Sequence, residues 1–496
     1  MNASSSHPLG STAELHARHG ERYRWLLLLS VMVGTMASIM SSTVVNVAIP
    51  GLSHQFELGQ SRAQWVTSGF MVATTVSMLT TPWLLERFGY RRTYAGCMLL
   101  LMAGGVLGGF AQNFPLVLAA RVTEGLAAGV VQPIPAIIIL RAFEPHEQGR
   151  ASGVFGMGVV LAPALGPSIG GLLVDWFGWR SIFFMVIPFC LASLWLGRRY
   201  VPVTGPGDVP GSRGVPLDWV GLLLGSLGTL SLLNGLVALR QGPAWQASTL
   251  LALALGSFLA FVLWLRWLPR RGRVPLLNLA LFGNRAFAMG ALVALIYGTA
   301  LFGSTYLLPV YLQTALGLSA AHVGTILLPS GLVLAGAIAV VARLADRMPA
   351  SLLVNIGLAL LALPFAGMLT VGLGSSLWWL TAWTIVGRIG LGFILPSLNL
   401  GAMRGLDRAQ MAQGSSVVNF VRMLGGAAGV SLCGIVLEWR LAVHGDSLAN
   451  QALSPERLSA FNEVFVMLAV LCALAMLAAR HLHTEPRPTP PPTGDN

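Results

Sequence analysis

The chain has 496 residues, of which 55% are hydrophobic and only 10% are charged, and its mean hydropathy is +0.73. A soluble protein carries about a quarter charged residues, so this composition excludes a soluble globular fold and indicates a polytopic membrane protein. The formal net charge is +12, and every basic residue is Arg. Because most of these Arg lie in short segments between apolar runs, where they set topology, the charge does not indicate a nucleic-acid partner.

Apolar runs follow one another along the chain, each long enough to cross a hydrocarbon core ~30 Å thick. We mark fourteen, approximately at 25–49, 64–85, 94–112, 115–140, 151–174, 178–197, 217–239, 245–268, 286–312, 323–342, 351–373, 376–403, 414–437 and 462–480. With the N-terminus inside, the inner segments hold 22 Arg and the outer segments hold 5. An even number of crossings and this asymmetry predict that both termini are cytoplasmic.

The chain also repeats itself. Leu-x-Glu-Arg at 84–87 is matched by Leu-x-Asp-Arg at 344–347, and Arg-x-x-x-Gly at 121–125 by the same pattern at 388–392. QGRASG at 148–153 corresponds to QGSSVV at 413–418 in the second half. Three matches in one order predict two similar six-helix halves, as in transporters whose site lies between parallel repeats.

The predicted fold is therefore an all-α polytopic membrane protein with two six-helix bundles and two extra central helices. The predicted segments are a cytoplasmic tail at 1–24, an N-terminal bundle at 25–197, a linker with the two extra helices at 198–285, a C-terminal bundle at 286–482 and a disordered tail at 483–496.

Three Arg lie well inside apolar runs, at positions 121, 388 and 422, whereas Glu124 is the only acid deep in one. Charge inside a bilayer is costly, so each of these residues is a functional candidate. Glu124 shares a helix face with Arg121, three residues before it. The functional interpretation is a proton carrier whose pKa burial raises and Arg121 lowers. The alternative is a permanent ion pair that only holds the helix in place.

The fifth apolar run contains GMGVVLAPALGPSIGG at 156–171. Its small residues permit close helix approach, and its prolines permit bending. This pattern predicts a conformational switch element, although plain small-residue packing explains the spacing equally well. The candidate switch residues here are Pro163, Gly166, Pro167, Gly170 and Gly171.

A charged loop at 80–94 places Glu86 beside Arg87 and Arg91 at a membrane edge, and Asp346 and Arg347 repeat this pattern in the second half. These residues could form a charge latch that closes one end of the molecule. The alternative is a set of topogenic Arg with a solvated acidic partner.

Uncharged polar residues inside the apolar runs are candidates to line a substrate path, with interhelical hydrogen bonding as the alternative for each. They are Ser41, Asn46, Gln132, Asn399 and Asn419. A nucleotide-binding P-loop needs a Lys, which this chain lacks, so ATP-driven transport is not expected. No metal cluster or nucleophile–base pair is visible either, so we expect no enzyme activity and no cofactor other than a proton gradient.

Together these motifs resemble the major facilitator superfamily over residues 24–482, and its fourteen-helix drug:proton antiporter branch of the EmrB/QacA type in particular. MSSTVVNVAIP at 40–50 is similar to the helix-one pattern L-D-x-T-x-x-N-x-A-x-P, with Ser41 in the place of the acid. The loop resembles G-x-L-x-D-R-x-G-R-R, with Glu86 for Asp. Arg121 and Gly125 match R-x-x-Q-G, with Glu124 for Gln, and the fifth run matches the antiporter motif.

This resemblance implies a rocker-switch antiporter of the bacterial inner membrane that exports amphipathic compounds in exchange for protons. For the EmrB group it also implies a periplasmic adaptor and an outer-membrane channel as partners, although the loop at 438–461 is shorter than expected for that group. The two departures lead to a hypothesis: the proton-carrying carboxylate has moved from position 41 to Glu124. A facilitator or lipid or metabolite exporter without proton coupling, and a non-transporting sensor or scaffold, remain alternatives.

Overall fold

The computed structural model describes residues 11–57, 60–144, 146–205, 216–318, 320–372, 374–407, 410–446 and 454–482. These residues form helices and their connections. The α-helices are α1 (Thr12–His19), α2 (Arg22–Gln55), α3 (Gln60–Met78), α4 (Thr81–Gly109), α5 (Phe114–Val131), α6 (Ile134–Ala142), α7 (Gln148–Phe177), α8 (Ser181–Tyr200), α9 (Trp219–Gln241), α10 (Ala244–Trp267), α11 (Arg285–Val310), α12 (Ala320–Ala345), α13 (Ala350–Gly367), α14 (Leu377–Met403), α15 (Met411–Val443) and α16 (Pro455–Ala479).

The helices coincide with the predicted apolar runs, because a chain with so few charges satisfies its backbone groups within helices when it crosses lipid. Ten helical segments in the described part of the chain are long and apolar enough to cross a membrane by length and composition. The all-helical, multi-pass architecture is thus confirmed. The count of fourteen crossings and the cytoplasmic side of the termini stay predictions, and the predicted tail at 483–496 lies outside the described residues.

One predicted run is interrupted in the structure, and another continues across a short junction. The run at 64–85 is interrupted, because α3 ends at Met78 and α4 begins at Thr81. The predicted charged loop is consequently the first part of α4, which kinks at Gly89 (φ 76°, ψ 171°). The kink needs glycine, since this φ disfavours side chains and a Cβ would collide with the carbonyl oxygen of Val203. The run at 115–140 passes from α5 to α6 at Gln132 and Pro133, where both residues keep helical backbone angles, so it forms one segment long enough to cross a membrane, Phe114–Ala142.

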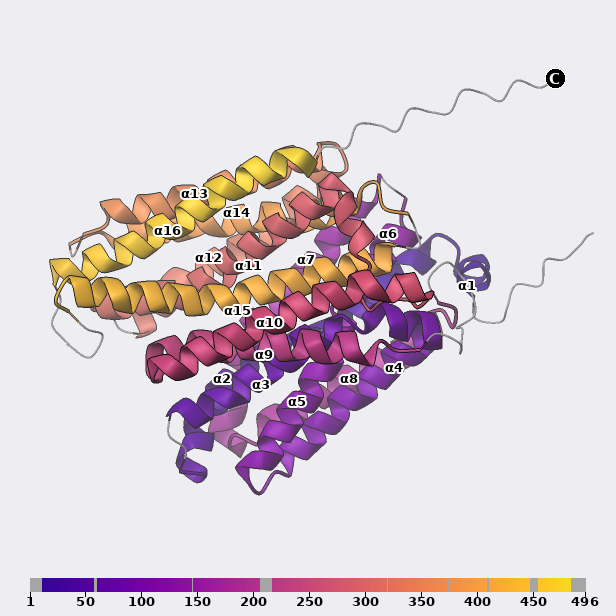
Figure 1. The fold of residues 1–496 in the computed structure, drawn as a ribbon, viewed down its shortest axis with the longest axis horizontal. Helices are drawn as coiled ribbons and strands as arrows, with labels where there is room; N and C mark the ends of the chain where they lie inside the picture. The colour runs from indigo at the N-terminus through magenta and orange to yellow at the C-terminus, as the bar shows by residue number, and fades with distance from the viewer. Residues whose placement is uncertain are drawn as a thin grey trace, which may run out of the picture.

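Two bundles are visible in Figure 1, one of α2 to α8 and one of α11 to α16, with α9 and α10 between them. Helices α2, α3, α4, α5, α7 and α8 pack mainly on one another, and so do α11 to α16. Helix α9 packs against α10 and touches both bundles, through α3 and α15. We call the end of the molecule that holds α1, residues 146–148 and residues 346–349 the terminal end, and the opposite end the far end.

Asp218 fixes the two extra helices at the terminal end. Its carboxylate accepts hydrogen bonds from the Gly221 backbone N–H (2.8 Å) and the Trp264 indole N–H (2.8 Å), at α9 and α10. It also accepts one from the Leu276 backbone N–H at 3.2 Å. This N-cap therefore joins both extra helices to the segment that leads into the second bundle.

The connection between α15 and α16 spans residues 444–454, because α15 continues to Val443 and α16 begins at Pro455. Both ends of the predicted extracytoplasmic loop at 438–461 are therefore helical, while its place outside the membrane stays a prediction. Helix ends extend beyond apolar runs wherever polar residues continue the helix at the membrane edge. Within α16, Glu463 pairs with Arg440 of α15 across this connection.

Candidate functional site

Arg121 and Glu124 of α5 form a buried ion pair, and each side chain is about 1% exposed. The Arg121 Nη1 donates to Glu124 Oε2 at 2.6 Å. Phe70 of α3 stacks on the guanidinium, with 4.4 Å between the guanidinium carbon and the ring centre. Gly104 of α4 makes the room, since a Cβ there would approach Glu124 Cγ to 2.6 Å. The predicted i, i+3 pair is thus present and enclosed by neighbouring helices.

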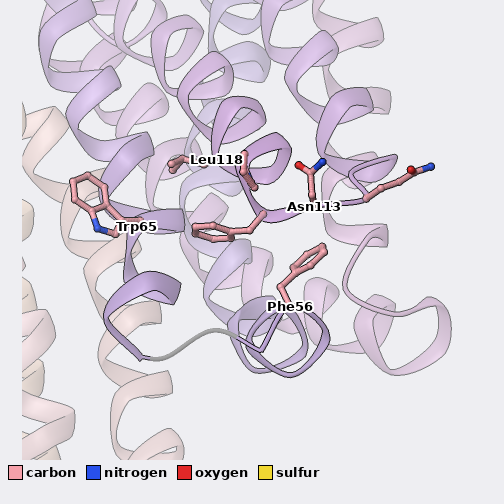
Figure 2. Close-up of a pocket in the computed structure, with 7 residues that line it drawn as sticks. Phe56, Trp65, Asn113 and Leu118 are labelled. Carbon is pink, nitrogen blue, oxygen red and sulfur yellow. The ribbon is translucent and has the colours of Figure 1, made fainter.

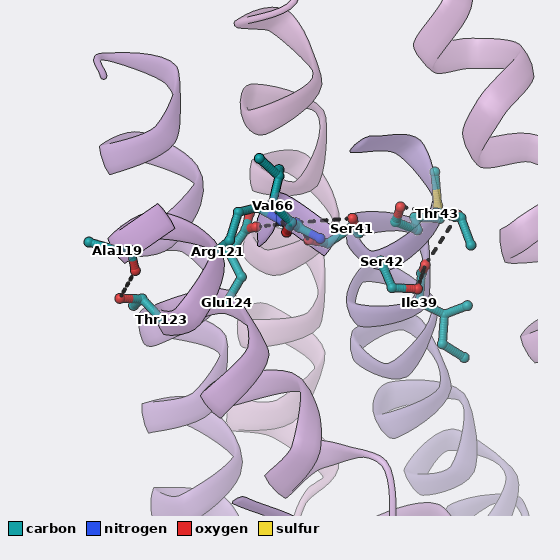
Figure 3. Close-up of polar contacts among 10 residues, drawn as sticks. Ile39, Ser41, Ser42, Thr43, Val66, Ala119, Arg121, Thr123 and Glu124 are labelled. Atoms are coloured by element: carbon teal, nitrogen blue, oxygen red, sulfur yellow. Dashed lines mark hydrogen bonds and ion pairs between the residues drawn. The ribbon is translucent and has the colours of Figure 1, made fainter. Parts of the chain in front are cut away.

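Ser41 of α2 completes this arrangement, as Figure 3 shows. Arg121 Nη1 donates to Ser41 Oγ (3.0 Å) and to the Ser41 carbonyl (3.1 Å). Its Nε donates to the Val66 carbonyl of α3 at 3.1 Å. Arg121 therefore joins α5 to α2 and α3. Ser41, which stands where the similar helix-one pattern has an acid, lies next to Arg121, the residue that pairs with Glu124. We call Ser41, Arg121 and Glu124 the carboxylate site.

The neighbouring hydroxyls of α2 do not take part in this network. Ser42 donates to the Ile39 carbonyl at 2.6 Å, and Thr43 donates to the carbonyls of Ile39 (3.3 Å) and Met40 (3.2 Å). Such bonds satisfy a hydroxyl within its own helix. Within the helix-one motif, the structure therefore directs Ser41 toward the ion pair, while the side chain of Asn46 lies outside the described residues.

The other predicted path residues are dispersed. Asn419 of α15 is buried, donates to the Ser415 carbonyl at 2.9 Å and accepts from Arg422 Nη2 at 3.0 Å. Gln132 lies at the break between α5 and α6, and Asn399 lies in α14, both part-buried. In the described part of the chain, no hydrogen bond connects Gln132 or Asn399 to the carboxylate site.

Helix α7 uses its glycines on two sides. At Gly166 and Gly170, a Cβ would meet Thr43 or Val44, so the antiporter-motif glycines allow α2 to pack closely. Gly171 has more room, with Val47 at 4.0 Å from its Cβ position. The side chains of Pro163 and Pro167 lie outside the described residues.

The second side of α7 faces the other bundle, a role that the sequence analysis missed. Cβ atoms at Gly149, Gly153 and Gly156 would press on Ala342 or Ile338 of α12. The i, i+4 spacing of Gly149 and Gly153 is the small-residue signal that could have identified this interface. These glycines let the two bundles meet at the terminal end.

Asp346 reinforces the same contact. Its carboxylate accepts from the Gly149 backbone N–H (2.7 Å) and the Arg150 backbone N–H (3.1 Å), at the N-terminus of α7. An acid at a helix N-terminus is favoured by the unsatisfied N–H groups there. Burial raises the pKa of Asp346, while the two hydrogen bonds oppose this shift. Arg347, its predicted companion, is exposed.

Glu86 occupies the corresponding place in the first half. It lines a small pocket with Gln413 at the start of α15 and with Asp218. Burial raises the pKa of Glu86, and the charge of Arg141 opposes the shift. Arg91 Nε donates to the Val201 carbonyl at 2.7 Å, and Arg87 stacks on Trp83. The acids of both halves thus face the start of a helix in the opposite bundle.

A separate groove of about 670 Å³ opens at the far end, between the end of α2, the start of α3 and the start of α5 (Figure 2). Its lining is mostly apolar and aromatic, and none of the predicted site residues belongs to it. The lining residues are Phe56, Trp65, Gln112, Asn113, Phe114, Pro115 and Leu118.

Comparison with known proteins identifies the family. The model of the Major Facilitator Superfamily matches residues 31–430. A multidrug resistance protein B homolog of Mycobacterium tuberculosis (strain H37Rv) is 30% identical over 87% of this chain and 80% of its own length. The fatty acid resistance protein FarB of Neisseria gonorrhoeae is 27% identical over 87% of this chain and 84% of its own.

A solved structure has the same fold. The human organic anion transporter MFSD10 aligns with a TM-score of 0.65 at 16% identity, over 92% of this chain and 99% of its own. The resemblance predicted from the motifs is confirmed, and the protein is a membrane transporter rather than an enzyme. The chain belongs to the major facilitator superfamily.

Proposed function

We propose that the protein exports amphipathic compounds across the bacterial inner membrane in exchange for protons, with Glu124 as the proton carrier. The observation that carries this proposal is the carboxylate site: a fully buried acid joined to one cation and to the helix-one position of the family acid. The name of the M. tuberculosis relative supports multidrug efflux, and the Arg distribution supports a cytoplasmic terminal end.

Protonation of Glu124 would couple to helix movement through Arg121. The ionised carboxylate holds the guanidinium, which at the same time binds α2 and α3. A proton on Glu124 removes the charge that Arg121 balances, and this weakens the tie between the three helices. Release of that proton on the other side restores the pair.

The latch at the terminal end supplies the alternating part of this mechanism. Asp346 and the α7 glycines close the bundles at that end, and breaking these contacts would let the terminal end open. Transport then alternates between closure at the terminal end and closure at the far end. The adaptor and outer-membrane channel stay predictions, to be tested by co-purification.

Proteoliposomes with an imposed pH gradient test this function. Decanesulfonate and decyltrimethylammonium serve as probes, because both are permanent ions and neither carries a proton across lipid by itself. Either probe should accelerate proton movement in wild-type vesicles. Glu124→Gln should abolish that movement while probe binding remains, and Ser41→Asp in the Glu124→Gln background should partly restore it, since Ser41 Oγ lies 3.0 Å from Arg121 Nη1.

A facilitator is the competing function, and the same vesicles distinguish it. Probe flux that is unchanged by the pH gradient, or proton movement that persists in Glu124→Gln, would contradict the proposal. Arg404→Gln, a change at an exposed residue after α14, is the control for vesicle quality.

A further inference from the structure

Arg388 of α14 and Arg422 of α15 lie deep in the second bundle. Arg388 is 11 residues from the start of α14 at Leu377, and thus about 16 Å from that helix end. Both side chains are only part-buried, so they retain accessible surface. A charge at such depth is costly unless something pairs with it.

Carboxylates that could pair with these two cations are missing from this part of the sequence. The acids of residues 286–482 are Asp346, Asp407, Glu438, Asp446, Glu456 and Glu463. All of them lie near helix ends or in connections. Glu438 is on the same helix as Arg422, but 16 residues away, which is about 24 Å.

The acids that do pair in this bundle serve other cations. Arg457 Nε donates to Asp446 Oδ2 at 3.0 Å, and Arg440 pairs with Glu463. Asp346 is bound to the N-terminus of α7. In the described part of the second bundle, no ion pair therefore neutralises Arg388 or Arg422.

Tyr297 of α11 lies in the part of the second bundle that holds Arg388 and Arg422. Its neighbour Gly298 packs on α15 so closely that a Cβ there would lie 2.0 Å from the Arg422 carbonyl oxygen, and Thr299 Oγ1 donates to the Gly425 carbonyl at 2.9 Å. Helix α14, which carries Arg388, also packs against α11, and Arg388 is electrostatically coupled to Tyr297. Arg422 Nη2 donates to Asn419, while its Nε is buried without a hydrogen-bond partner among the described residues. Three helices thus bring two positive charges, a phenol and an unused N–H donor to one place.

The two helices that carry these Arg also border the first bundle. Helices α14 and α15 are packed within the second bundle and also contact the first, through α7, α3 and α6. The repeat puts Arg388 where Arg121 stands in the first half, but Leu391 takes the place of Glu124. In the first half Glu124 balances the charge of Arg121, whereas the second half has no acid at the equivalent position.

We infer that Arg388, Arg422 and Tyr297 form a binding site for the anionic head of an amphipathic substrate, such as a carboxylate or sulfonate. This inference rests on the proposed transport function and names its substrate class. Two guanidinium groups provide the forked N–H donors that suit such an oxyanion, and the phenol adds a third donor. Substrate binding would then remove the cost of two unpaired buried cations.

Binding in non-ionic detergent tests this site without any proton gradient. The probes are decanesulfonate and decyltrimethylammonium, equal in chain length and opposite in charge, below their micelle concentrations. Their dissociation constants follow from the thermal stabilisation of the protein. Wild-type protein should bind the sulfonate at least about tenfold more tightly than the ammonium ion. Equal affinity, or a preference for the cation, would overturn the inference.

Variants assign the preference to named residues. Arg388→Gln and Arg422→Gln should each weaken sulfonate binding by about ten- to hundredfold, the range for a hydrogen bond to a charged group. Ammonium binding should stay within about twofold of wild type or improve. Tyr297→Phe should weaken sulfonate binding by about two- to tenfold. This variant keeps the aromatic ring, so it still tests the site if a Gln variant fails to fold. Arg388→Lys should retain part of the affinity.

The exposed control Arg404→Gln should change nothing. An equal loss in this control, or unchanged sulfonate binding in both Gln variants and Tyr297→Phe, would refute the site. The binding test of this site and the transport test of the proposed function can fail independently of one another. If Glu124→Gln abolishes coupling but the sulfonate shows no preference, only the anion site fails. If the sulfonate binds as expected but moves no protons, only the antiport proposal fails.

Discussion

The two halves of this transporter place an Arg at the same point of their repeat and surround it differently. Arg121 is enclosed by Glu124, Ser41 and Phe70, and its charge is balanced within the chain. Arg388 has Leu391 at the equivalent of Glu124, and among the described residues no ion pair balances its charge or that of Arg422 in the same bundle. One repeated framework therefore holds the proposed proton site in one half and the proposed anion site in the other.

This division gives the two activities separate helices. The carboxylate site joins α2, α3 and α5, while the proposed anion site joins α11, α14 and α15. A proton on Glu124 and a substrate on Arg388 would each change the charge of one bundle. The bundles contact one another through α7 and α12 at the terminal end, so both events can act on the same closure.

The largest expected effect comes from breaking the balanced pair. Glu124→Ala leaves the Arg121 charge buried and should destabilise the protein by about 3–5 kcal/mol. Arg121→Ala should cost less, because an orphaned Glu can take up a proton whereas an Arg stays charged. Thermal unfolding in detergent measures both. Equal losses in the two variants would show that Glu124 is not free to change protonation state.

Copying the pair into the second half should remove the difference between the halves. Leu391→Glu puts a carboxylate three residues after Arg388, as Glu124 follows Arg121. It should weaken decanesulfonate binding by about tenfold or more, because the new acid takes the place of the substrate anion. Leu391→Gln is the matched control for shape and should weaken binding much less. If both variants weaken it equally, the loss reflects packing and not charge.

The contact between the bundles can be weakened separately from either site. Gly153→Val would collide with Ala342 and should cost the closed terminal end about 1–3 kcal/mol through overpacking. Spin labels at the exposed positions 92 and 404 would report a shift toward longer distances. Gly336→Val, on α12 where a Cβ meets nothing within 4 Å, is the control. A shift of equal size in the control would contradict the interpretation.

The smallest effect concerns the pH dependence of the latch. Because burial raises the pKa of Asp346 at the closed end, closure binds protons and should be favoured as pH falls through that raised value, then lost as pH rises. The change should be on the order of 1 kcal/mol or less for one part-exposed group.

Asp346→Asn keeps an oxygen acceptor for the Gly149 N–H and removes the titrating group. The same label pair should then report closure that no longer depends on pH in the acidic range. A pH dependence that survives unchanged in Asp346→Asn would assign it to another residue. Arg347→Gln, at the exposed neighbour, is the matched control and should leave the dependence intact.

Composition and residue spacing were enough to predict the membrane class, the all-helical architecture and the proximity of Arg121 to Glu124. Each depends on composition or on spacing along one helix, and helix geometry is local. The predicted run at 64–85 was wrong in one respect, because α3 ends at Met78 and α4 begins at Thr81 within it. The motif residues of α7 were found, but not that Gly153 faces α12.

The contacts between side chains of different helices became visible only in the folded chain. Ser41 lies against Arg121 although 80 positions separate them, and Arg388, Arg422 and Tyr297 lie in one part of the second bundle on three helices that pack together. Membrane helices are apolar on most sides, so their sequences carry a weak signal of which face is turned toward which neighbour. That choice is made by close packing among small residues and by the pairing of the few buried charges, and both are properties of the assembled bundles.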